Sequence, residues 1–139
     1  MFHFEIQWVQ LLAVAFANFI LSWLWYSPVL FGKPFMKVLG IPEGHQMTEA
    51  EKKKMPFLMA NGFFCSLLLS FVLQVFCRSL GAADFVQGAL VGILAWAGFA
   101  LTGSLGTLWE NRSMTLIKIS NGLYLLAYAV FGGIIAVWH

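Results

Sequence analysis

Residues 57–77 read FLMANGFFCSLLLSFVLQVFC, a stretch without a single charged side chain. A helix of about 20 apolar residues crosses the ~30 Å hydrocarbon core of a bilayer. The Leu, Phe and Val residues of the stretch contribute roughly −0.3 to −0.6 kcal/mol each on the membrane-insertion scale, which outweighs the unfavourable contributions of Asn61 and Gln74. The stretch therefore predicts a transmembrane helix.

Three other uncharged runs accompany it, between Glu5 and Lys33, between Asp84 and Glu110, and from Ile119 to the terminal His139. The chain is 60% hydrophobic and only 10% charged, whereas about a quarter of the residues of an ordinary soluble domain are charged. Strand-like alternation is absent, which argues against a barrel. We therefore predict one all-α integral membrane domain, residues 1–139, whose four transmembrane helices form an up-and-down antiparallel bundle. The spans are expected near residues 6–26, 57–77, 85–108 and 116–137.

Basic residues are distributed unevenly between the two sides of such a bundle. Four spans place both termini on one side and the connections near residues 27–56 and 109–115 on the other. Nearly all Lys and Arg residues lie with these connections, and Arg78 alone lies on the opposite side. Since positive residues stay in the cytoplasm, we expect a cytoplasmic interfacial loop at 27–56 and non-cytoplasmic termini in the cell inner membrane. No basic stripe suggests a nucleic-acid partner.

A signal peptide is the competing interpretation of the N-terminal apolar run. Residues 1–7 contain no Lys or Arg, and the apolar run that follows is too long for a typical signal sequence. We therefore expect the first helix to be retained.

The loop at 27–56 carries its own helix signals. Residues 34–40 resemble a short amphipathic turn that begins with Pro and ends with Gly. Thr48 and Glu51 fit a capping box, so the second long helix is expected to begin before the membrane. Pro56 predicts a kink or a break at the bilayer boundary. The lysines at 52–54 serve topology alone or attract anionic lipid.

Polar side chains within the spans must face protein or water, because an unpaired amide in hydrocarbon costs several kcal/mol. Two interpretations remain open: structural hydrogen bonds between helices, worth about 0.6 kcal/mol each, or a polar path along the bundle. The candidate path residues are Asn18, Asn61, Ser66, Gln74, Asn121 and Tyr124.

Charged residues near the membrane gather around the last hairpin, at Glu110, Arg112 and Lys118. They form either an ion-pair network that fixes the hairpin, or a gate or anionic-ligand site. Phosphate-loop and zinc signatures are absent, and no acidic residue lies in mid-membrane, so we expect no cofactor and no enzymatic activity. His3, Glu5 and His139 would share one side of the membrane. A metal site formed by these residues is the alternative to our expectation that the protein binds no metal. Cys65 and Cys77 lie too far apart on one helix to bridge, and we expect both to be buried.

Three segments resemble one family. Trp25-Tyr26-Ser27-Pro28-x-x-Phe31-Gly32-Lys33, Glu110-Asn111-Arg112-Ser113 and Ile119-Ser120-Asn121-Gly122-x-Tyr124 are similar to the bacterial family called domain of unknown function 1761. The resemblance implies a four-span membrane protein and no assigned activity. From these segments we expect a rigid cytoplasmic rim, formed by Trp25, Tyr26, Pro28, Phe31, Gly32 and Lys33, that packs against Glu110, Arg112 and Asn121.

Three function classes follow. The first is an oligomeric structural or interaction module, a homo-oligomer formed through glycine faces with membrane lipid as its surroundings. The alternative is a carrier or channel for a small solute or ion, with the polar path as its route and an unidentified small-molecule ligand. An integral membrane enzyme is the third class, and it lacks the convergent acids that such a site needs.

Overall fold

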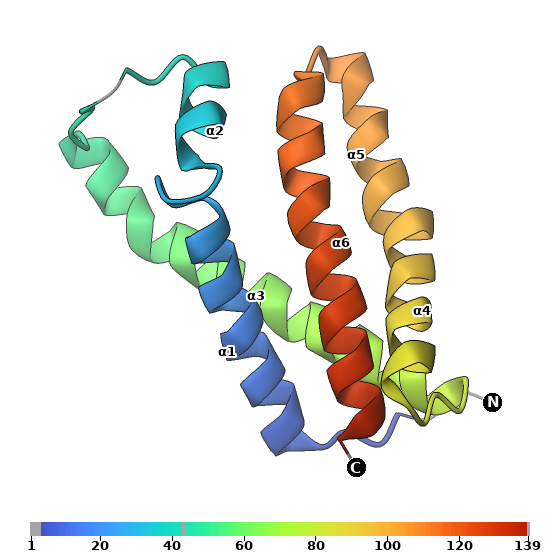
Figure 1. Cartoon of the computed structure of the whole chain (residues 1–139). Helices are drawn as coiled ribbons and strands as arrows, with labels where there is room; N and C mark the ends of the chain where they lie inside the picture. The colour runs from blue at the N-terminus through green and yellow to red at the C-terminus, as the bar shows by residue number, and fades with distance from the viewer. Residues whose placement is uncertain (1–3, 43, 139) are drawn as a thin grey trace.

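The structure is a computed structural model that describes residues 4–42 and 44–138. In these ranges it is all-helical, without a strand. The elements, in chain order, are α1 (Trp8–Trp25), α2 (Gly32–Val38), α3 (Glu49–Ser79), α4 (Phe85–Ala95), the π-helix η1 (Trp96–Leu101), α5 (Thr102–Gly106), the 3₁₀-helix η2 (Thr107–Glu110) and α6 (Met114–Val137) (Figure 1).

Four helical segments are long and apolar enough to cross a membrane. They are α1, α3, the continuous run Phe85–Glu110, and α6. The prediction of an all-α fold with four spans is confirmed, and three spans agree with the expected bounds to within a few residues. The connections between consecutive spans alternate between the two ends of the bundle. We call the end that carries α2 and η2 the loop end, and the opposite one the terminal end.

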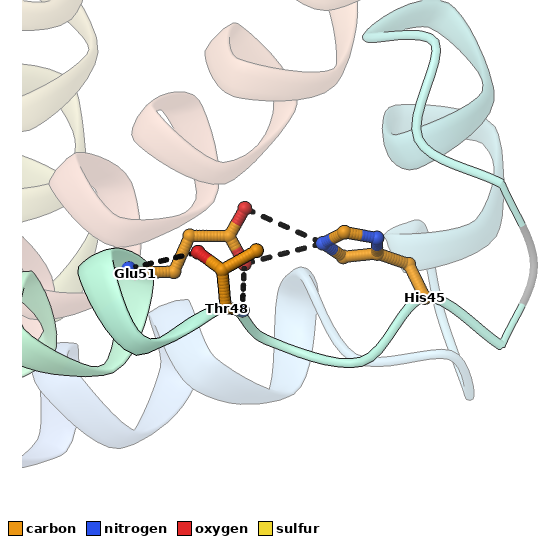
Figure 2. Close-up of polar contacts among 3 residues, drawn as sticks. All are labelled: His45, Thr48 and Glu51. Carbon is orange, nitrogen blue, oxygen red and sulfur yellow. Dashed lines mark hydrogen bonds and ion pairs between the residues drawn. The ribbon is translucent and has the colours of Figure 1, made fainter.

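The helix α3 extends beyond the apolar stretch because local caps define its ends. Figure 2 shows the predicted capping box: Glu51 N–H donates to Thr48 Oγ1 at 3.2 Å, and Thr48 N–H donates to the Glu51 carboxylate at 3.0 Å. His45 Nε2 lies 3.2 Å from the same carboxylate. The Thr48 hydrogen bond and then His45 hold the pKa of the Glu51 carboxyl below its usual value. The helix thus begins in its charged first turns, ahead of the membrane-spanning part, as expected.

Pro56 does not break α3, which is continuous from Glu49 to Ser79. A proline removes the hydrogen bond to the carbonyl four residues earlier, here that of Lys52. The side chains of residues 49–54 are exposed, so water can satisfy this carbonyl outside the hydrocarbon. Of the two outcomes expected at Pro56, a kink or a break, the break does not occur.

The most buried span is α6, which contacts each of the other three spans. Its closest neighbour is α4: a Cβ built on Gly88 would lie 2.1 Å from the Gly132 carbonyl oxygen, and one built on Gly92 1.9 Å from that of Tyr128. Small residues between membrane helices usually serve to let the two backbones approach this closely. A compact core of Val14, Leu73, Cys77, Ala127, Phe131 and Ile135 joins α1, α3 and α6.

The bundle opens toward the loop end. Figure 1 shows α3 passing diagonally behind α1, and the N-terminal half of α3 lies away from α6. The π-helix η1 interrupts the third span, and a Cβ built on Gly98 within it, or on Gly103 and Gly106 beyond it, has no atom within 4 Å. The α5 segment therefore packs loosely on α6, and cavities lie at this end of the molecule.

Candidate ligand site in the membrane span

A cavity of about 320 Å³ lies between α1, α3 and α6. Its apolar lining comes from Leu69, Leu123 and Ala127, and Cys65 also reaches it. Its polar lining consists of two serine hydroxyls, one amide and three tyrosines, namely Asn18, Ser22, Tyr26, Ser66, Tyr124 and Tyr128. An apolar wall with a few convergent polar groups is typical of a small-molecule site.

Hydrogen bonds within the cavity wall satisfy the serine donors. Asn18 Nδ2 donates to Ser66 Oγ at 2.8 Å, and Ser66 Oγ donates to the Gly62 carbonyl at 3.0 Å. Ser22 Oγ donates to the Asn18 carbonyl at 2.9 Å. Within the described ranges, no partner is found for Asn18 Oδ1 or for the hydroxyls of Tyr124 and Tyr128. The cavity therefore offers three free polar groups to an occupant.

A smaller pocket of about 150 Å³ adjoins this cavity at the loop end. Tyr124 lines both spaces. The hydroxyl groups of Tyr26, which lines the cavity, and Ser120, which lines the pocket, lie 3.1 Å apart. The two spaces thus meet at a contact between α1 and α6.

Two of the six residues expected to form a rim, Trp25 and Tyr26, contact α6. Trp25 Nε1 donates to the Ile119 carbonyl at 2.9 Å, and the Trp25 ring lies 4.6 Å from that of Phe31 between centroids. Gly32 is buried, and a Cβ there would lie 2.5 Å from the Tyr26 carbonyl oxygen. These contacts hold α2 against the last span.

The other expected rim residues lie outside this contact. Pro28 and Lys33 are exposed and line a surface groove along α2. In the part of the chain that the structure describes, no ion pair joins Glu110, Arg112 and Lys118. Arg112 lines the small pocket, Lys118 lines a separate groove beside Asn121, and Glu110 is exposed. The charged residues of the hairpin therefore do not form the ion-pair network that the sequence suggested.

The six candidate path residues do not form one path. Asn18, Ser66 and Tyr124 share the cavity. Gln74 is fully buried and exchanges two 3.2 Å hydrogen bonds with the backbone of residue 7, while Asn121 is buried and donates to the Ile117 carbonyl at 2.9 Å. Asn61 is exposed on the outer face of α3.

Sequence reasoning missed several polar groups. Gln10 is fully buried, and its Nε2 donates to the Trp138 carbonyl at 2.8 Å, although its position in an apolar run was visible. Tyr26 was assigned to the rim alone, and Tyr128 and Ser104 were not assigned to a site. Cys77 is buried as expected, but Cys65 is exposed, so the prediction of two buried cysteines was wrong for Cys65.

Metal-binding groups of three or more His, Cys, Asp or Glu side chains are absent from the described ranges. The histidines at positions 3 and 139, which the sequence had suggested as metal ligands, lie outside these ranges.

Four long apolar helices and a polar cavity between them define a multi-pass α-helical membrane protein. The chain belongs to the family described as "Protein of unknown function (DUF1761)", whose sequence profile matches residues 9–136. The resemblance noted from the sequence is therefore confirmed over nearly the whole chain. Comparisons with curated proteins and with solved structures gave no match.

Proposed function

We propose that the protein binds a small polar solute in the cavity between α1, α3 and α6, as a carrier or receptor within the membrane. The observation that supports this proposal is the free amide oxygen of Asn18 together with the free hydroxyls of Tyr124 and Tyr128. In an apolar bundle such groups cost several kcal/mol each unless water or a ligand satisfies them. The proposal assigns the chain no enzymatic activity.

The distribution of Lys and Arg supports an orientation with the loop end in the cytoplasm of the cell and both termini on the other side of the inner membrane. The cavity would then communicate with the cytoplasm through the loop end, where the bundle is loosest.

The native cysteines test whether the cavity holds water. Cys65 lines the cavity and is exposed, whereas Cys77 is 1% exposed. A charged, membrane-impermeant thiol reagent reacts with thiolates in water and is excluded from hydrocarbon. In proteoliposomes we expect the reagent to modify Cys65 and to leave Cys77 unmodified.

A matched control separates a wet cavity from simple exposure. Leu68 is 47% exposed on the same helix and does not line the cavity. The variant Leu68→Cys, made in a Cys65→Ser background, should react at least tenfold more slowly than native Cys65. Equal rates at the two positions would show that the cavity is lipid-filled, and the proposal would fall.

A second candidate function, assembly into a homo-oligomer, is favoured by Asn61. Its amide is exposed in an apolar span, and no partner for it exists in the described ranges. A second copy of the chain presents the same amide, so two copies related by a twofold axis would satisfy each other. Interhelical hydrogen bonds of this kind contribute about 0.6 kcal/mol each, and up to about 1.7.

Molecular mass in detergent tests the homo-oligomer. The protomer mass is 15.5 kDa, and light scattering after subtraction of detergent should give a multiple of it. Asn61→Leu should shift the population toward the monomer, whereas Asn61→Gln, which keeps an amide, and Leu94→Ala, at an exposed site on α4, should not. A monomeric wild type would exclude this candidate.

A further inference from the structure

The side chains that line the 150 Å³ pocket at the loop end include one that is positively charged and none that is negatively charged. Arg112 lines it, together with Ser104, Thr107, Ser120 and Tyr124 from α5, η2 and α6, and no carboxylate is among the lining residues. Glu110 lies two positions away in the chain, yet no ion pair involves Arg112 in the described part of the protein. The guanidinium group therefore has its full donor capacity available.

The hydroxyl groups of the pocket add further donors. No partner for the hydroxyls of Ser104 and Tyr124 is found among the described residues. Ser120 shares a hydrogen bond with Tyr26, and Thr107 Oγ1 donates to the Ser104 carbonyl at 2.6 Å. Two free hydroxyls and one guanidinium thus line a single small space.

This set of groups fits an oxyanion. Arginine presents five N–H donors in a planar fork that matches carboxylate and phosphate oxygens, and hydroxyls supply additional hydrogen bonds without charge. A cation would be repelled by Arg112, and an apolar molecule would leave the donors unsatisfied. The volume equals about five water molecules at ~30 Å³ each, which is room enough for a small oxyanion.

We propose that Arg112, with the hydroxyls of Ser104, Ser120 and Tyr124, binds a small oxyanion at the loop end. Tyr124 also lines the large cavity. The solute proposed for that cavity is therefore an anion, an assignment that rests on the proposed function. The oxyanion is either a free phosphate or carboxylate, or the phosphate of a lipid headgroup.

Inorganic phosphate in neutral detergent provides the test. Purified protein is melted in a series of phosphate concentrations at constant ionic strength, and the apparent affinity is obtained from the rise in melting temperature. Arg112→Gln should weaken phosphate binding about ten- to hundredfold, the range for a lost charged hydrogen bond. Tyr124→Phe should weaken it about two- to tenfold.

The control variant is Lys118→Gln, which removes a charge near the same end of the bundle but from a different groove. It should bind phosphate as the wild type does. Arg112 is exposed, and no hydrogen bond or ion pair of its side chain is found in the described ranges, so Arg112→Gln should melt like the wild type when phosphate is absent. This comparison separates a lost site from a lost fold.

Experiments in lipid vesicles distinguish a soluble oxyanion from the phosphate of a lipid headgroup. If free phosphate has no effect but phosphatidylglycerol vesicles stabilise the wild type more than phosphatidylcholine vesicles do, and Arg112→Gln removes the difference, the ligand is a headgroup phosphate. Stabilisation by free phosphate supports a soluble anion. If neither probe stabilises the wild type, or if Arg112→Gln responds as the wild type does, the anion site is refuted.

The cavity and the anion site can fail separately. If Cys65 is reactive but neither phosphate nor phosphatidylglycerol stabilises the protein, the anion site alone is refuted. If Cys65 is unreactive but either probe stabilises the protein through Arg112, the proposed solute cavity is refuted and the anion site remains.

Discussion

Replacing Gly92 by alanine should force α4 and α6 apart. The added Cβ would lie 1.9 Å from the Tyr128 carbonyl oxygen, about 1.5 Å short of the 3.4 Å at which ordinary contact begins. The obstructing atom belongs to the backbone of α6, so no side-chain rotation can relieve the clash.

The expected cost follows from two opposing effects. Separation by 0.5–1 Å forfeits a quarter to a half of each dispersion contact across an interface, and overpacking substitutions generally cost about 1–3 kcal/mol. The better helix propensity of alanine returns at most about 1 kcal/mol. Because the clash is with backbone, we expect a net loss of about 2 kcal/mol in the free energy of unfolding.

The matched control is Gly103→Ala in the same span, where a built Cβ has no atom within 4 Å. Only the propensity effect operates there, so this variant should gain about 0.5–1 kcal/mol. Both free energies are measured by titrating mixed micelles with dodecyl sulfate and following the far-ultraviolet circular dichroism. Substitutions with the same sign of effect, or a Gly92→Ala protein as stable as the wild type, would refute the close packing of α4 on α6.

Four further predictions concern local contacts. In a double-mutant cycle, Asn18→Leu and Ser66→Ala should show a coupling of about 0.6 kcal/mol, and at most about 1.7, from their 2.8 Å hydrogen bond; additive effects would mean that the bond is not formed. Gly32→Ala should cost about 1–3 kcal/mol, since its Cβ would lie 2.5 Å from backbone, and an unchanged melting temperature would contradict the rim. Thr48→Ala should cost about 1 kcal/mol through loss of the helix cap. In the wild type, the lowered pKa of Glu51 stabilises this first turn fully above pH 4.5, its ordinary value, and the effect is lost as the pH falls through the lowered pKa. Hydrogen exchange at the Glu51 amide measures the loss of the cap, and exchange at the Thr48 amide measures the carboxylate contact. Exchange at Thr48 that is independent of pH after correction for the intrinsic rate would argue against the carboxylate contact.

The spans and several of their ends could be predicted from the sequence, because they depend on properties that run along the chain. The length of an uncharged apolar run decides whether it crosses hydrocarbon, and this property placed all four spans. The capping box at Thr48 and Glu51 involves neighbours three residues apart, so it also could be recognised. The rim was partly predictable, because Trp25, Phe31 and Gly32 lie close together in the chain.

The candidate site depends on contacts between distant segments. The Asn18 to Ser66 hydrogen bond joins residues 48 positions apart. The small pocket is lined by residues of α5, η2 and α6, which lie up to 21 positions apart in the chain, and no residue pattern indicated the π-helix η1 that precedes α5.

The sequence alone therefore determined that this chain has four helices long and apolar enough to cross a membrane, whereas the tertiary structure decided which polar residues meet. Asn61 and Ser66 occupy the same span, yet Asn61 is exposed and Ser66 is buried beside Asn18. The physical reason is that a membrane helix is apolar on every side, so its hydrophobic pattern does not indicate which face turns inward. That rotation is decided by side-chain packing and by interhelical hydrogen bonds, which form only when all the helices are in place.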